Sequence, residues 1–308
     1  MLKTRIAFFG SAGWKLTNIH LKRFIERKAN IVVFVRSSAD KVKSTVQKTN
    51  TRESMEHAAK RLGIPLLSRE NIKTKEFQEE FLRYKPDAAI VCGYQLYIPR
   101  SIRDIVPIGI INFHSSLLPR HAGMHPGFWT IWYGDKISGM TVHFMDDGID
   151  TGDILYVSKV QVKNEDSIES LYERIWESST PLVDRLLYDL DKETLPRTSQ
   201  DYSKYIYNYE ITDKDFELDF RQPAEILAGR VSMLPGRFYV VLNNEKYFLD
   251  DCRAVDESVN TRKFKINKPY FIDRKVVYVT PRQYLEIKKV HKDGADFKPV
   301  DLLRIIES

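Results

Sequence analysis

Two polar segments in the middle of the chain contain the side chains that acyl transfer to an amine requires. The first, residues 112–119, reads Asn-Phe-His-Ser-Ser-Leu-Leu-Pro, and the second, residues 146–153, reads Asp-Asp-Gly-Ile-Asp-Thr-Gly-Asp. An amide N–H can stabilise a developing oxyanion, an imidazole can carry a proton, and a carboxylate can orient that imidazole. Asn112, His114 and Asp150 are therefore the candidate catalytic residues, provided that the fold brings the two segments together.

Strand-like and helix-like segments alternate in the first half of the chain. Short apolar runs that predict buried strands occupy residues 6–9, 31–35, 88–92 and 108–113. Segments with helical patterning lie between them, near residues 16–28, 52–62 and 74–83. This alternation predicts a parallel sheet with helices on both faces and a ligand site beyond the carboxyl ends of its strands. Asn112 and His114 lie two residues apart at the end of a predicted strand, so their side chains should point to the same face.

The second half of the chain predicts the end of the α/β domain and then a separate, smaller domain. Strand-like runs at residues 141–145 and 155–162 flank the acidic loop, and a long helix should begin near Asp166 or Ser167. After a polar, tyrosine-rich stretch, further strand-like runs and a final helix occupy residues 237–242, 246–249, 275–280, 284–290 and 299–307. We predict an α/β domain with a parallel-rich sheet over residues 1–192, a linker over residues 193–209 and a small β-rich domain over residues 210–308.

The composition is that of a globular protein with real cores. At 308 residues and 43% hydrophobic content, the chain is long and apolar enough for two domains. No apolar run approaches the roughly 20 residues that a membrane span requires, so we expect no membrane partner. Cys92 and Cys252 match no metal or redox spacing, which predicts free thiols and a cytoplasmic protein. No set of His, Cys and Asp residues has zinc spacing, and no metal is expected.

The net charge of +6 lies almost wholly in the first two thirds of the chain. Residues 206–308 contain 18 Lys and Arg residues against 17 Asp and Glu residues. A basic protein can bind nucleic acid, but it can equally bind small anionic ligands such as folates and nucleotides. The absence of a dense basic stripe disfavours a large nucleic-acid surface.

Each motif, seen alone, also has a purely structural interpretation. An isolated Asn-x-His is more often a turn residue and a hydrogen-bonded histidine, and an isolated acidic loop is more often a solvated turn. The acidic loop lacks the alternating ligands and the final Glu of a calcium loop. The turn at residues 10–13 is either a plain strand-to-helix connection or a close approach to a phosphate. His143 fits a packed core histidine, and residues 121, 125, 128 and 129 fit either packing or contacts with a substrate.

Taken together, these segments resemble the formyltransferase family that uses 10-formyltetrahydrofolate. The residues that carry the resemblance are the run at 112–119, Gly134-Asp135, the Gly-Met-Thr-Val-His run at 139–143, and Asp150. The similarity extends from the first predicted strand to about residue 190. Residues 210–212, 223–226 and 233–236 resemble the start of the small β-barrel that the family appends. The resemblance implies a Rossmann-like catalytic domain followed by an OB-like domain.

The resemblance also implies a role for each candidate residue. Asn112 would donate a hydrogen bond to the oxyanion, His114 would carry a proton from the amine to the departing folate nitrogen, and Asp150 would hold His114 and raise its proton affinity. The formyl donor would be 10-formyltetrahydrofolate, with no metal. The implied folate contacts are Gly93, Tyr94, Leu96, Ile98, Ser116, Leu117, Leu118, Pro119, Asp146, Asp147 and Gly148. The predicted acceptor contacts are Gly10, Arg120, His125 and Trp129.

The acceptor amine is predicted from the differences between this chain and the members of the family that act on tRNA. The tRNA-directed members carry a basic insertion containing Gly-Arg-Gly after the second strand, whereas residues 36–45 of this chain lack those glycines. The near-neutral second domain also differs from a tRNA-binding surface. The Met-His-Pro-Gly-Phe-Trp run at residues 124–129 looks more like enzymes that formylate a nucleotide-linked amino sugar. We therefore predict an amino-sugar nucleotide as acceptor, with methionyl-tRNA as the alternative.

Other readings of the same resemblance stay open. A purine-precursor acceptor is disfavoured, because those members are shorter and lack the second domain. A peptide-type amine as acceptor, hydrolysis of the formyl-folate, and a non-catalytic folate sensor are further alternatives. Exposed strand edges in the small domain make a homodimer a reasonable expectation.

Overall fold

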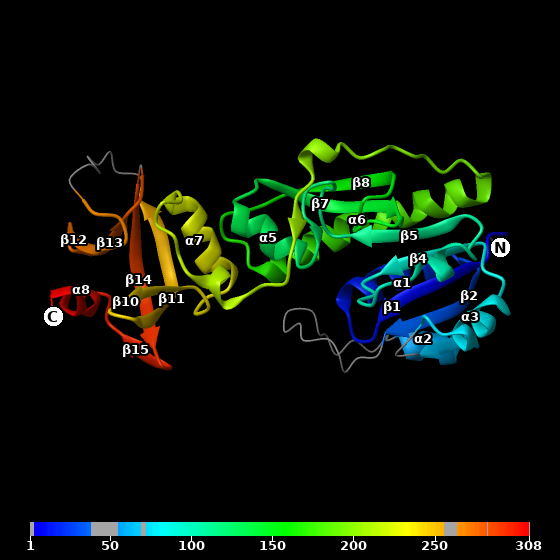
Figure 1. Cartoon of the computed structure of the whole chain (residues 1–308), viewed down its shortest axis with the longest axis horizontal. Coiled ribbons are helices and arrows are strands. Elements are labelled where there is room, and N and C mark those ends of the chain that lie inside the picture. Colours follow the sequence, from blue (N-terminus) through cyan, green and yellow to red (C-terminus); the bar gives the residue numbers. More distant parts are fainter. Residues whose placement is uncertain (1–2, 38–54, 69–71, 256–263, 282, 308) are drawn as a thin grey trace. The chain divides into compact units, whose positions relative to one another are not determined.

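The computed structural model describes residues 3–37, 55–68, 72–255, 264–281 and 283–307 (Figure 1). The chain divides into two compact units. The first unit comprises Met1–Pro126, Ile137–Val160 and Tyr172–Asn208. The second unit comprises Gly127–Lys136, Gln161–Leu171 and Tyr209–Ser308. The candidate catalytic residues all belong to the first unit.

The first unit is built on a mostly parallel sheet, as the alternating pattern predicts. Among the described residues this sheet has seven strands, in the order β3-β2-β1-β4-β5-β7-β8. Strands β1 to β5 pair in parallel, and β7 is antiparallel to β5. The strands are β1 (Ile6–Ser11), β2 (Ile31–Ser37), β3 (Leu66–Ser68), β4 (Ala88–Cys92), β5 (Gly109–His114), β7 (Ile137–Phe144) and β8 (Ile154–Gln161).

Helices cover both faces of this sheet because its strands are apolar on both sides. Phe9 and its same-face neighbours pack with Phe77 and Phe81 of α3 (Lys75–Leu82) and with Ile102 of α4 (Arg100–Arg103). On the other face, Phe8 contacts Phe24 of α1 (Lys15–Glu26). Helix α1 is tied in turn to the long helix α6 (Ile168–Lys192). These contacts confirm a doubly covered, Rossmann-like α/β fold.

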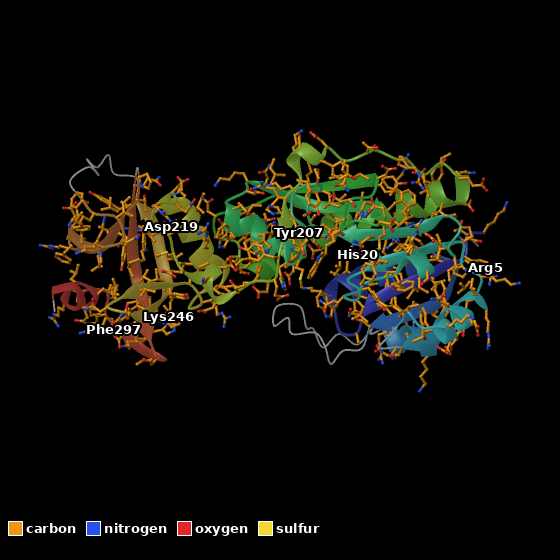
Figure 2. The ribbon with its side chains drawn as sticks, in the orientation of Figure 1. Arg5, His20, Tyr207, Asp219, Lys246 and Phe297 are labelled. Carbon is orange, nitrogen blue, oxygen red and sulfur yellow. The ribbon has the colours of Figure 1, made fainter. Side chains whose placement is uncertain are left out.

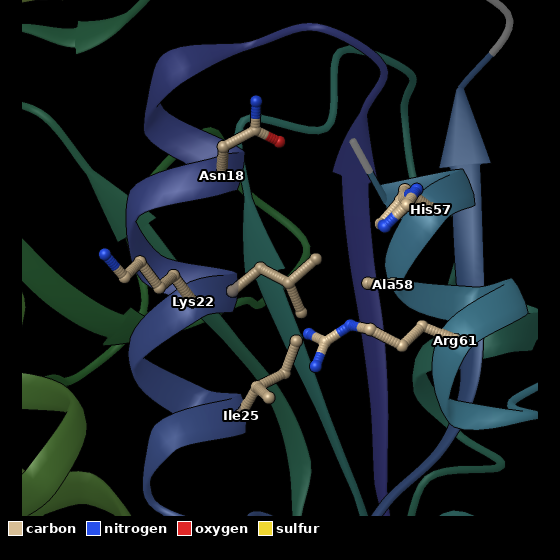
Figure 3. Close-up of a pocket in the computed structure, with 7 residues that line it drawn as sticks. Asn18, Lys22, Ile25, His57, Ala58 and Arg61 are labelled. Atoms are coloured by element: carbon tan, nitrogen blue, oxygen red, sulfur yellow. The ribbon is translucent and has the colours of Figure 1, made fainter. Parts of the chain in front are cut away.

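The small helix α2 (Met55–Leu62) lies beside α1. The two helices border a pocket, shown in Figure 3. It is lined by Asn18, Leu21, Lys22, Ile25, His57, Ala58 and Arg61. None of these is a predicted site residue. Residues 52–54 of the predicted helix at 52–62 lie outside the described part of the chain.

The second unit is a small β-rich domain, which confirms that part of the prediction. Its antiparallel strands run in the order β10-β11-β14-β13-β12, with β15 beside β14. Helix α7 (Ala224–Met233) packs on β11 and β14. The pairings between described residues leave this sheet open, so an OB-like closed barrel stays a prediction. The remaining elements are α5 (Pro126–Tyr133), β10 (Tyr239–Leu242), β11 (Glu245–Val255), β12 (Pro269–Ile272), β13 (Lys275–Val279), β14 (Tyr284–Lys292), β15 (Ala295–Phe297) and α8 (Asp301–Glu307).

Neither cysteine forms a disulfide, and both thiols are buried. Burial raises the pKa of Cys92, and it raises the pKa of Cys252 to about 12. In the described ranges, the structure has no helix with both the length and the apolar character to cross a membrane.

The buried His20, labelled in Figure 2, makes the stability of the first unit depend on pH. Its Nδ1 lies 2.9 Å from the Leu16 carbonyl oxygen, and its Nε2 lies 2.9 Å from Ser179 Oγ of α6. Burial lowers the pKa of His20 from 6.5 to about 4. The unfolded chain therefore takes up this proton at higher pH than the folded chain. The free energy of unfolding should fall by about 2 kcal/mol between about pH 7.5 and pH 5 on this account.

Urea unfolding of the wild-type protein and of the variant His20→Gln at these two pH values tests the prediction. Glutamine keeps hydrogen-bonding groups at this position but does not titrate. Its absolute stability will be lower, but its loss of stability on acidification should be smaller by about 2 kcal/mol. Equal losses in the two proteins would assign the acid sensitivity to other groups.

Candidate active site

The candidate active site lies at the end of β5, where the β7–β8 loop (residues 145–153) meets it. The side chains of Asn112 and His114 point to the same face, as their spacing predicts. Asp150, in the loop, lies against both of them. Its Oδ2 is 3.4 Å from His114 Nδ1, and its Oδ1 is 3.5 Å from Asn112 Nδ2. The fold therefore brings the two polar segments together.

Both ring nitrogens of His114 face protein groups. Nε2 lies 2.8 Å from the carbonyl oxygen of His121. Since a carbonyl only accepts hydrogen bonds, Nε2 carries the hydrogen in the neutral ring, and Nδ1 is the atom that gains or loses a proton. Burial lowers the pKa of His114, although the charge of Asp150 acts to raise it. At neutral pH the ring is therefore uncharged, with its lone pair at Nδ1 beside the carboxylate.

The family resemblance implies that Asp150 raises the proton affinity of His114. The carboxylate does act in that direction, but burial of the imidazole outweighs it. The net result suits a general base, because a ring that is neutral at pH 7 is ready to accept a proton.

Asp150 is held as an ionised carboxylate in an unusual backbone conformation. Its φ is 54°, in the left-handed region, and its side chain is 14% exposed. Its Oδ2 accepts a 2.8 Å hydrogen bond from the Gly123 N–H. Burial acts to raise the pKa of Asp150, but the nearby imidazoles of His114 and His143 and the Gly123 N–H together hold it below its ordinary value.

His143 belongs to the site, which the sequence analysis did not predict. It is fully buried, as expected of a core histidine, but its ring also orients Asn112. Its Nδ1 lies 2.8 Å from the Phe144 carbonyl oxygen and so carries the hydrogen, which leaves Nε2 to accept from Asn112 Nδ2 at 3.2 Å. His143 stands opposite Asn112 in the pairing of β7 with β5. This register places its ring beside Asn112, and the sequence alone does not give the register.

The residues assigned to folate lie in three loops of the first unit. The first loop follows β4 and includes Gly93, in the left-handed region with φ 71°, and the half-buried Tyr94. Its other members are the partly exposed Leu96 and the buried Ile98. The hydroxyl of Tyr94 is buried and has no hydrogen-bond partner within the described residues. A polar atom of a bound ligand would satisfy it.

The second loop follows β5 and packs against β7. Ser116 is fully buried, and its Oγ donates to the Arg120 carbonyl oxygen at 2.8 Å. The backbone N–H of Leu118 donates to Thr141 Oγ1 at 3.1 Å. Leu117 and Pro119 are partly exposed, and the Leu118–Pro119 peptide bond is cis. These contacts fix the backbone of residues 116–119. The Ser116 hydroxyl is used for a hydrogen bond within the loop.

The third loop connects β7 to β8 and is held by its own acidic residues. Asp146 Oδ1 accepts hydrogen bonds from Thr151 Oγ1 at 2.6 Å and from the Gly148 N–H at 3.1 Å. Asp147 forms an ion pair with Arg103 of α4. Both carboxylates are therefore engaged in shaping the loop that carries Asp150. In the described part of the chain, no group of three or more His, Cys, Asp or Glu residues is arranged to hold a metal ion.

The sequence that forms this site matches a known protein family. A family model described as formyl transferase matches residues 4–185, which is more than half of the chain. The chain belongs to the formyltransferase family. The matched residues include every strand and loop of the candidate site.

Relatives similar to the chain in sequence include methionyl-tRNA formyltransferases. The methionyl-tRNA formyltransferase of Halothermothrix orenii is 34% identical over 167 residues, which cover 54% of this chain and 53% of the relative. That of Koribacter versatilis is 31% identical over 213 residues, 68% of each chain. The chain thus spans about half the length of the first relative and about two thirds of the second.

Similar solved structures include enzymes that act on sugars. An N-formyltransferase from Helicobacter canadensis, solved in complex with folinic acid and dTDP-3-aminofucose, gives a TM-score of 0.64 at 16% identity. The match covers 94% of this chain and 100% of that one. The sugar 3N-formyl transferase WlaRD gives 0.63 at 16% identity, covering 95% of this chain and 98% of that one. At this level of identity the two structures establish the fold.

Of the predicted acceptor contacts, Gly10, Arg120 and His125 belong to the first unit and Trp129 belongs to the second. Gly10 is the last residue but one of β1, and a Cβ atom there would lie 2.4 Å from Thr17 Cγ2, so its small size serves packing. Arg120 and His125 are partly exposed and follow β5. Trp129 is 1% exposed and packs against Tyr209 within the second unit. Protein side chains thus cover the ring of Trp129, which agrees with the packing interpretation, and its contact with an acceptor stays a prediction.

Residues 38–45 of the segment that was compared with the tRNA-type insertion lie outside the described residues. That segment therefore bears on the acceptor through its sequence alone.

Proposed function

We propose that this formyltransferase moves the formyl group of 10-formyltetrahydrofolate to a primary amine. The observation that carries the proposal is the meeting of an amide, a neutral imidazole and an ionised carboxylate within 3.5 Å at the end of β5. Family membership supplies the reaction class. The folate would lie against the backbone at residues 93–98 and 116–119 and against the loop at 146–148, with the unpaired Tyr94 hydroxyl available to its polar ring.

Each of the three residues has a distinct part in the transfer. Asn112 Nδ2 donates a hydrogen bond to the formyl oxygen as negative charge develops on it during attack by the amine. Its present bond to Asp150 Oδ1 is long, at 3.5 Å, so this N–H can turn to a closer acceptor. His114 takes a proton from the amine at Nδ1 and delivers it to the departing folate nitrogen. Asp150 stabilises the imidazolium that exists between these two events.

As acceptor we propose the amino group of a nucleotide-linked sugar. The near-neutral composition of residues 206–308 and the resemblance of residues 124–129 to sugar-directed enzymes support this choice. The full-length fold match to the Helicobacter canadensis enzyme, which was solved with a nucleotide-linked amino sugar, agrees with it. The second candidate is methionyl-tRNA, which the named sequence relatives favour.

Release of tetrahydrofolate from 10-formyltetrahydrofolate tests the proposal. The acceptors to compare are a panel of amino-sugar nucleotides, methionyl-tRNA, uncharged tRNA and a no-acceptor control. Turnover that depends on one sugar nucleotide would support the proposal and name the acceptor. Turnover only with methionyl-tRNA would show that the acceptor was misassigned. Release without any acceptor would indicate a hydrolase, and no release in any sample would contradict the proposed activity.

A further inference from the structure

The tyrosine-rich segment that was predicted to be a linker is bound to the catalytic loop. We call residues 200–205 the strap. Gln200 Nε2 donates to the carbonyl oxygens of Asp150, at 2.8 Å, and Gly152, at 2.7 Å. The hydroxyls of Tyr202 and Tyr205 donate to the carbonyl oxygens of residues 151 and 149, at 2.8 and 3.0 Å. Four consecutive carbonyl groups, from residue 149 to residue 152, thus accept hydrogen bonds from strap side chains.

The loop needs such support because of the conformation at its centre. A left-handed φ is unfavourable for a residue with a side chain, so the surroundings must hold Asp150 at 54°. The bonds within the loop come from Asp146, at its start, and do not reach the carbonyl groups around Asp150. The strap supplies the missing restraint on both sides of the catalytic carboxylate.

The burial of Gln200 indicates that its donors matter. This side chain is 6% exposed, and its Oε1 is buried without a hydrogen-bond partner among the described residues. A buried unpaired acceptor is unfavourable. The amide is therefore kept in place by its two N–H bonds to the loop, and a residue without donors would lose both.

The residues that follow the strap lie beside a direct contact of the Asp150 carboxylate. Strand β9 (Tyr207–Asn208), whose Tyr207 is labelled in Figure 2, pairs with β6 (Ala122–Gly123). The Gly123 N–H is the donor to Asp150 Oδ2. The segment after α6 thus contacts the backbone of Asp150 directly and fixes the strand that binds its side chain.

We propose that Gln200, Tyr202 and Tyr205 are positioning residues for formyl transfer, which hold the backbone of residues 149–152 so that the Asp150 carboxylate stays beside His114 Nδ1. The inference rests on the proposed function. Within the described residues, these three side chains donate their hydrogen bonds to the carbonyl oxygens of residues 149–152 and not to His114 or Asn112. They act through the geometry of the loop.

The variant Gln200→Met tests this role, because methionine has similar length but no donor. We expect kcat to fall about tenfold to a hundredfold, since small misplacement of a catalytic group has effects of this size, while KM for both substrates changes less than about twofold. The acid limb of kcat/KM should move to lower pH. His114 is faced by Asp150, His143 and His121. Of these groups, only the Asp150 carboxylate would move away. Because its negative charge favours the protonated ring, the pKa of His114 would fall.

Two further variants keep the test independent of folding. The double variant Tyr202→Phe/Tyr205→Phe removes only hydroxyl groups, and we expect a smaller fall in kcat with the same direction of pH shift. Tyr188→Phe on α6, an exposed tyrosine remote in sequence from the loop, is the matched control and should behave as wild type. A strap that served only stability would lower the melting temperature of these variants without moving the acid limb, which would overturn the proposal.

A measurement without substrate separates this proposal from the proposed function. Titration of the His114 ring by NMR, assigned with His114→Ala, should give a lower pKa in Gln200→Met than in the wild type. An unchanged titration would refute the strap as a positioning device, whether or not the wild-type enzyme transfers formyl groups. A shifted titration with no formyl transfer in any assay would support the strap and contradict the proposed function.

Discussion

Replacement of His114 by alanine is expected to lower kcat by about 10²- to 10⁴-fold, the usual contribution of a positioned proton-transfer group. The expectation rests on the geometry of the ring. Nε2 is committed to the His121 carbonyl oxygen at 2.8 Å, and Nδ1 carries the free lone pair beside Asp150. His143 also places one ring nitrogen on a carbonyl oxygen and the other 3.5 Å from Asp150, but that second nitrogen, Nε2, lies 3.2 Å from Asn112 Nδ2 as well. Tetrahydrofolate release under saturating substrates measures the effect.

The pH dependence adds a signature that a structural role would not produce. The pKa of His114 is lowered by burial, so the ring is a competent base at neutral pH and is lost as a base on acidification. The wild-type kcat/KM should therefore be constant near neutral pH. It should fall only at pH values below the ordinary pKa of histidine. The residual activity of His114→Ala should lack this acid limb. His57→Ala, on the exposed side of α2, is the control. Near-normal turnover in His114→Ala would show that the ring does not transfer a proton in the reaction.

The main sheet could be predicted because its strands obey a simple physical rule. A strand buried on both faces must be apolar throughout, and β1, β2, β4 and β5 each begin within one residue of a predicted apolar run. The shared direction of Asn112 and His114 follows from the two-residue period of a strand. Local rules were sufficient for these features.

The supporting residues of the site depend on contacts that no local rule gives. His143 reaches Asn112 only because β7 pairs with β5 in one particular register, and a shift of one residue would turn its ring to the other face. Gln200 reaches Asp150 across about 50 residues, so its role follows only from tertiary structure. The polar, tyrosine-rich sequence around Gln200 predicts a linker. In the structure, the hydroxyls of two of these tyrosines donate hydrogen bonds to the catalytic loop.

Trp129 shows another limit of prediction from sequence. An aromatic residue beside a motif could equally fill a core or stack on a ligand, and the sequence offers no means of separating the two. Its indole is surrounded by Phe128, Trp132 and Tyr209 within the second unit. Burial of that area stabilises the unit whether or not a sugar binds. The acceptor must therefore be found by assay rather than inferred from this residue.

Replacement of Asn112 by alanine is expected to lower kcat by about 10²- to 10³-fold, the usual effect of removing one oxyanion donor. Because the amide does not titrate, the acid limb set by His114 should stay at the same pH while the whole profile is scaled down. KM should change little, since the bond forms as charge develops. Steady-state rates across the pH range measure both quantities. A shifted acid limb would instead mean that Asn112 acts by ordering Asp150, to which it lies 3.5 Å away.

The double variant Asn112→Ala/His114→Ala decides whether the two residues serve one step. If the hydrogen bond to the formyl oxygen and the proton transfer both act during attack by the amine, neither is fully useful without the other. The combined loss in kcat should then be smaller than the product of the two single losses. A fully multiplicative loss would place the two contributions in separate steps, with Asn112 acting on the oxygen and His114 acting only as the folate nitrogen departs.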